Sequence, residues 1–85
     1  MKLPIIKQLT EFAKRKDVDY LHETIEVLEE ITEISSLKDA DLDVIGELLS
    51  NLYGAIEVHQ MIVQGTPQKE ALNGFMQRVM GSIDT

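Results

Sequence analysis

The sequence predicts an all-α fold: a compact four-helix bundle with one long central helix, assembled as a dimer. Leu, Ile and Val recur at intervals of three and four residues, which is the period of an amphipathic helix. Both of the 2 prolines stand where such a periodic segment begins. The 85 residues are expected to form a single domain, residues 1–85, whose core is small and has no disulfide to support it.

The first two helices are expected over residues 4–16 and 20–34. Pro4 suits the first turn of a helix, because proline fixes φ and lacks the N–H group that would be unsatisfied there. Asp19 is expected to cap the second helix, since its carboxylate can accept the free N–H groups of the next turn. The polar face of the second helix carries five glutamates and no Lys or Arg, so it has no internal ion pairs.

The third helix is expected over residues 40–64 and would be about 37 Å long. Seven positions along it follow a heptad spacing with one polar member, which is typical of a packing seam. The seam consists of Leu42, Ile45, Leu49, Leu52, Ile56, His59 and Val63. The first helix is about half as long and cannot cover the third. We therefore expect a second copy of the chain to complete the packing, although the sequence leaves open whether the seam lies within one chain or between two.

Three small residues, Gly46, Ser50 and Gly54, share another face of the third helix. Glycine inside a helix costs about 1 kcal/mol relative to alanine, so this row predicts the close approach of another helix. An alternative is that Gly46 or Gly54 marks a kink or a local end of the third helix. The sequence does not say whether the packing neighbour belongs to the same chain.

The fourth helix is expected over residues 67–81. Gly65, Thr66 and Pro67 mark the boundary before it. Glycine suits the position after the third helix, threonine caps the next helix, and proline occupies its first position.

Charge is distributed unevenly along this chain of net charge −7. Residues 1–16 have a net charge of +4, and residues 17–64 have a net charge of −11. We expect the basic first helix to pair with the acidic middle, within one chain or between subunits. The alternative is that these charges form the solvated polar faces of amphipathic helices. Because the dominant field is negative, nucleic acid is not an expected partner.

No motif for a reaction, cofactor or metal is present, so we expect no catalytic residue, no cofactor, no metal site and no enzyme activity. The chain lacks cysteine, which excludes thiolate chemistry. Its two histidines, His22 and His59, do not belong to a zincin or di-iron motif. No apolar run reaches the ~18–20 residues that cross a bilayer, so no membrane partner is expected. The N-terminal segment lacks the apolar run and cleavage site of a signal peptide, so a cytoplasmic location is expected.

His59 is the polar member of the seam. It is expected to be a core or interface histidine whose ring nitrogens are hydrogen-bonded. A pH-sensitive interface is the alternative, because protonating a buried imidazole costs stability.

These observations favour a non-enzymatic interaction module, a homodimer that could also bind an unidentified protein. One alternative is an acidic regulator that occupies a basic protein surface as a nucleic-acid mimic. This alternative requires an exposed acidic stripe, comprising Glu26, Glu29, Glu30, Glu33, Asp39, Asp41, Asp43 and Glu47. If Lys7, Lys14 and Arg15 neutralise that stripe, the mimic hypothesis fails. A metal-binding or ligand-binding bundle that uses His59 is the third alternative.

Three segments carry a resemblance to a known family: residues 1–4, 43–48 and 65–82. They read MKLP, DVIGEL and GTPQKEALNGFMQRVMGS. In these segments the chain resembles a small family of uncharacterised bacterial proteins of this length. The resemblance implies a short bacterial cytoplasmic protein. It implies no activity and no site residues.

Overall fold

Four helices make up residues 2–84, the part of the chain that this computed structural model describes, with side chains described for residues 2–79. The helices are α1 (Leu3–Arg15), α2 (Asp19–Ile31), α3 (Asp39–Val63) and α4 (Gln68–Asp84). No strand occurs in this part of the chain, and the helices pack against one another. The all-α, four-helix prediction is therefore confirmed.

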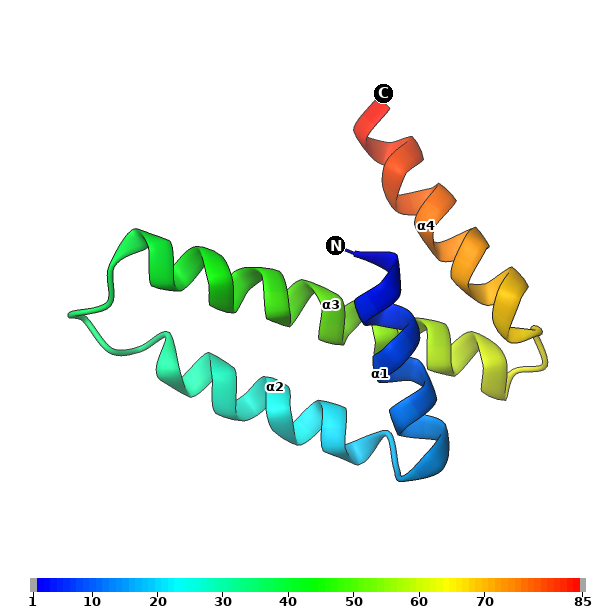
Figure 1. The fold of residues 1–85 in the computed structure, drawn as a ribbon, viewed down its shortest axis with the longest axis horizontal. Helices are drawn as coiled ribbons and strands as arrows, with labels where there is room; N and C mark the ends of the chain where they lie inside the picture. Colours follow the sequence, from blue (N-terminus) through cyan, green and yellow to red (C-terminus); the bar gives the residue numbers. More distant parts are fainter. Residues whose placement is uncertain (1, 85) are drawn as a thin grey trace.

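Helix α1 crosses α3 near the middle of its length, as Figure 1 shows. Pro4 lies in its first turn, as expected. The start of α1 is fixed to α3 by a hydrogen bond of 2.8 Å from the Lys2 backbone N–H to Oδ1 of Asn51. Asn51 is fully buried, and it also donates a hydrogen bond of 2.8 Å to the Glu47 carbonyl of its own helix. Its amide therefore satisfies backbone groups of two elements.

Helix α2 differs from the expectation at both ends. Asp17, rather than Asp19, supplies the acidic side chain at its start, since Oδ1 of Asp17 accepts the Asp19 N–H at 2.8 Å. The helix ends at Ile31 instead of Ile34, because the chain tightens there into shorter turns. The Ile34 N–H bonds the Ile31 carbonyl at 3.1 Å, which is the 3₁₀ pattern that often ends a helix.

Helix α3 is continuous through both Gly46 and Gly54, so neither glycine ends it. It stops at Gly65, where φ is 111°, a conformation that side chains with a Cβ rarely adopt. The Thr66 N–H bonds the Met61 carbonyl at 2.9 Å, which completes a Schellman motif. The predicted role of Gly65 is confirmed.

The core lies where α1, the first half of α2 and the start of α4 pack on the second half of α3. Its buried apolar members are Ile6, Ala13, Leu21, Ile25, Leu52, Ala55, Ile56, Val58, Ala71, Leu72 and Phe75. None of residues 26–50 is buried. This segment, which we name the arm, is the end of α2, the loop after it and the first half of α3. In Figure 1 the arm projects away from α1 and α4 as a two-helix hairpin.

Candidate interaction surfaces

One face of the arm carries apolar side chains that no other element covers. We define the arm face as Val27, Ile31, Ile34, Val44 and Leu48. All but the half-buried Ile31 are exposed, and Leu48 has 42% of its surface accessible. The extents of the Cα trace, 43 × 36 × 17 Å, leave no room for a third layer of helices.

The position of α1 explains why the arm face is uncovered. Val44 and Leu48 continue the row that holds Asn51 and Ala55, at spacings of four, three and four residues along α3. The two later members are fully buried, whereas the two earlier members lie beyond the point where Asn51 fixes the start of α1. Apart from the buried Asn51, this row on α3 is therefore apolar, but only its second half is covered.

Helix α2 shows the same division. Tyr20, Val27 and Ile31 lie on one side of the helix at intervals of seven and four residues. The Tyr20 ring meets Phe12 of α1 edge to face, with ring centroids 5.6 Å apart. This contact places the row on the side of the hairpin where α1 lies, and Val27 and Ile31 continue it past the reach of α1. Both helices of the arm thus present apolar side chains on the same side.

The predicted seam is divided between core and surface. Leu52 and Ile56, with 5% and 8% of their surfaces exposed, belong to the core of the chain. Ile45, Leu49 and His59 are half-buried. The two ends of the seam, Leu42 and Val63, are exposed, the latter at 72%.

The row of small residues is divided as well. A Cβ at Gly54 would lie 3.0 Å from the Phe75 ring and 3.1 Å from Cδ1 of Ile6, so α1 and α4 both approach closely there. Ser50 is half-buried. Gly46 is exposed, and a Cβ there would have no neighbour within 4 Å. At Gly54 the close neighbours belong to the same chain.

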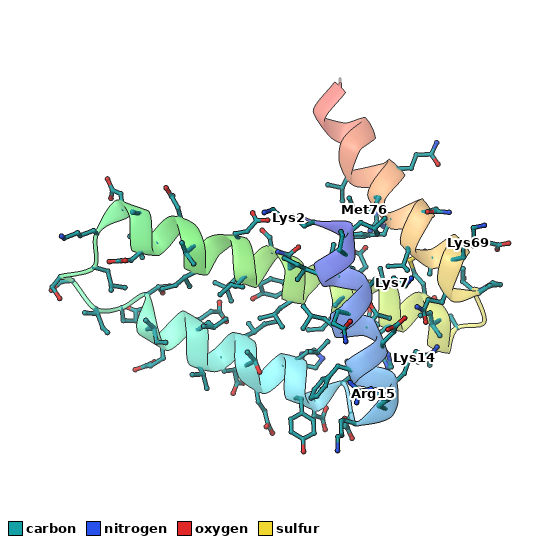
Figure 2. The ribbon with its side chains drawn as sticks, viewed as in Figure 1. Lys2, Lys7, Lys14, Arg15, Lys69 and Met76 are labelled. Carbon is teal, nitrogen blue, oxygen red and sulfur yellow. The ribbon has the colours of Figure 1, made fainter. Side chains whose placement is uncertain are left out.

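The basic first helix is expected to pair with the acidic middle of the chain or of a second subunit, but among the described side chains of one chain the α1 cations form no ion pair with the α2 glutamates. Lys14 instead donates a hydrogen bond of 2.8 Å to Oε1 of Gln68 on α4. Arg15 lies over the Phe12 ring, 5.7 Å from its centroid. The ion pair between Arg78 and Glu57 joins α4 to α3. Lys7 and Lys14 lie on the side of α1 that faces α4, away from the acidic arm (Figures 1 and 2).

The members of the predicted acidic stripe lie on the arm. Seven are exposed, and Glu47 is half-buried. Lys7, Lys14 and Arg15 form no described hydrogen bond or ion pair with the stripe residues of α2, so the condition that would exclude a nucleic-acid mimic is not met there.

A groove runs between α1 and the start of α4. It holds a cavity of about 560 Å³, lined by Leu3, Lys7, Glu11, Gln68, Lys69, Leu72 and Asn73. An adjoining cavity of about 340 Å³ is lined by Glu11, Lys14, Arg15 and Gln68. We name the two together the α1–α4 groove. The sequence does not indicate this groove, because no sequence pattern shows that Lys7 and Lys69 line one cavity between two helices.

His59 is not satisfied in the way the sequence predicts. Its Nδ1 atom is buried and has no hydrogen-bond partner among the described residues. Within the same residues no group of three or more His, Asp or Glu side chains is arranged to hold a metal ion. No helix of the described chain is long and apolar enough to cross a membrane.

The four packed helices, the open arm and the groove define a small all-α protein. It belongs to DUF6952, a family of unknown function, whose family model matches residues 1–84. The resemblance to a small uncharacterised family is therefore confirmed. Neither a curated protein nor a solved structure matches the chain.

Proposed function

We propose that the protein is a non-enzymatic interaction module that forms a homodimer through its arm face. The observation that carries the proposal is that none of residues 26–50 is buried, although they form two packed helices with apolar rows on one side. Isolated helices of this length are marginal in water without tertiary packing. A second arm laid across the first would complete a four-helix bundle and bury both rows.

The proposed contact is a symmetric one. In a two-fold dimer the same patch of each subunit meets its counterpart, so Leu48 would contact the partner's arm face. The carboxylates at the edges of the two arms would then repel each other. This repulsion is screened by salt, so dimerisation should strengthen as ionic strength rises.

The solution mass tests this proposal. Sedimentation equilibrium at about 10 µM protein detects dissociation constants in the micromolar range. We expect twice the 9.6 kDa mass of the chain for the wild type. We expect the chain mass itself for Leu48→Lys, with helical circular dichroism retained because Leu48 is exposed.

Two variants complete the design. Val63→Lys introduces the same charge on an exposed apolar position of α3 outside the arm, and it should leave the dimer intact. Leu52→Lys should unfold the chain, because Leu52 is a core residue with 5% of its surface exposed. A wild-type monomer at this concentration, or a Leu48→Lys variant that stays dimeric, would contradict the proposal.

A second candidate function is the acidic regulator that occupies a basic protein surface. Its support is that the stripe residues of α2 are exposed and form no described ion pair with α1. The full chain immobilised at low salt should then retain strongly basic proteins, and Glu26→Lys with Glu30→Lys should release them. Equal retention by this variant would remove the candidate.

A further inference from the structure

The α1–α4 groove has an apolar floor, and hydrogen bonds join its two walls at one end. Leu72 is buried at its base, and Leu3 packs half-buried against the core. The side-chain amide of Gln68 joins the two walls, since Oε1 accepts from Lys14 at 2.8 Å and Nε2 donates to Glu11 at 3.5 Å. These two hydrogen bonds connect α1 to the first turn of α4 at this end of the groove.

The groove concentrates positive charge in an acidic protein. Four of the 8 Lys and Arg residues line its two cavities, against the single carboxylate of Glu11. Figure 2 shows Lys7 and Lys14 on the side of α1 that faces α4, and Lys69 of α4 lines the same cavity as Lys7. Lys7 and Lys69 are exposed at the rim. Like charges gathered along one groove repel one another, and an anionic ligand would relieve that repulsion.

The dimensions of the groove favour an extended ligand over a single small anion. The cavities share Glu11 and Gln68, so they adjoin, and together their linings span α1 from Leu3 to Arg15. A helix of these 13 residues is about 20 Å long. An amphipathic helix of similar length lies in such a groove with its apolar side chains on the floor.

We propose that the α1–α4 groove binds an acidic amphipathic helical segment of a partner protein. The apolar side chains of that segment would lie on Leu3 and Leu72, and its carboxylates would meet Lys7 and Lys69. Nucleic acid fits less well, because no aromatic side chain lines either cavity to stack on a base. The homodimer proposed above would form through the arm, which projects on the other side of α1 from α4 (Figure 1). The dimer proposed above would leave the groove open in each subunit.

Fluorescence anisotropy with the full-length protein tests the groove. The probe is a labelled synthetic peptide of about 15 residues that, as a helix, places Leu on one face and Glu on the other, about 22 Å long. We expect saturable binding at concentrations below about 100 µM, weakening as salt is added. Replacing the Glu residues of the probe by Gln should weaken binding.

The variant Lys7→Glu with Lys69→Glu reverses the charge at the rim and should weaken binding at least about tenfold. Lys7→Gln with Lys69→Gln removes the charge without reversing it and should weaken binding about threefold, which provides a test if the first variant folds poorly. Lys38→Glu is the matched control: this exposed lysine precedes α3 at the far end of the arm, and its reversal should not change the affinity.

Four binding results would overturn the proposal. They are the absence of saturable binding to the wild type, unchanged affinity in both groove variants, equal binding of the Gln probe, and tighter binding of a single-stranded dT oligonucleotide. Loss of the dimer mass in the groove variants would also overturn it, because the groove would then hold the acidic α2 of a second copy. A monomeric wild type that binds the probe would refute the arm dimer alone, so the two proposals fail separately.

Discussion

Alanine substitutions at Gly54 and Gly46 compare a closely packed position on α3 with an open one on the same row. Gly54→Ala adds a methyl group 3.0 Å from two ring carbons of Phe75 and 3.1 Å from Cδ1 of Ile6. Carbon atoms pack best at about 3.5–4.0 Å, so the neighbours must move by roughly 0.5 Å. Phe75 and Ile6 are 2% and 0% exposed, which leaves neither of them free space to move into.

The magnitude follows from two opposing effects. Overpacking a core by one methyl group costs about 1–3 kcal/mol. Exchanging glycine for alanine inside a helix stabilises it by about 0.5–1 kcal/mol. Gly54→Ala should therefore lower the free energy of unfolding by up to about 2 kcal/mol. Gly46→Ala, with no neighbour within 4 Å, should raise it by the helix contribution alone. The difference between the variants isolates the steric cost.

Thermal and urea unfolding followed by circular dichroism measure both variants. One kcal/mol shifts Tm by about 4–8 °C in a domain of this size, so the two melting temperatures should lie on either side of the wild-type value. The protein concentration is held constant, because the stability of a dimer depends on it. Equal stabilisation by the two substitutions would refute the close contact at Gly54. Destabilisation by Gly46→Ala would show that Gly46 is covered in solution.

Three further substitutions test individual packing features. Asn51→Leu leaves the Lys2 N–H without its acceptor. It should therefore destabilise the chain by about 1–3 kcal/mol in urea unfolding and speed amide exchange in the first turn of α1. Slow exchange there would show that α1 is held in another way. Gly65→Ala should lower the free energy of unfolding by about 1–2 kcal/mol, since the left-handed φ of 111° is strained for any residue with a Cβ. An unchanged unfolding midpoint would mean that the turn adopts another conformation. His59→Leu should raise the free energy of unfolding by about 1 kcal/mol, because it removes a buried Nδ1 that has no partner among the described residues. A loss of stability would indicate that a water or a second chain satisfies this atom.

Single residues with restricted or unusual φ angles predicted two of the helix boundaries well. Pro4 and Gly65 act through their own φ angles, so their positions in the sequence were enough to place a helix start and a helix end. The end of α2 was harder to predict. Ile34 fits the apolar period of the helix, but the chain tightens after Ile31, and the period carries no information on that change.

The candidate surfaces were predicted less completely. The length of α3 relative to α1 correctly indicated that part of α3 stays uncovered, but the heptad positions pointed to a seam whose centre, Leu52 and Ile56, lies in the core. The exposed apolar rows of the arm face are in the sequence, yet only the position of α1 shows which of their members remain open. The α1–α4 groove joins residues from the two ends of the chain, and no spacing rule connects them.

The sequence by itself determined the class of fold, the continuity of the apolar rows and the segregation of charge, because these depend on residue type and on the fixed geometry of a helix. The tertiary structure decided which faces meet. The hydrogen bond from Lys2 to Asn51 fixes where α1 begins on α3, and the absence of a side chain at Gly54 lets Ile6 and Phe75 approach there. Together these contacts set the course of α1 over α3, leave the arm face open and place Lys14 beside Gln68 of α4. Such contacts join residues far apart in the chain, and packing in three dimensions is what brings them together.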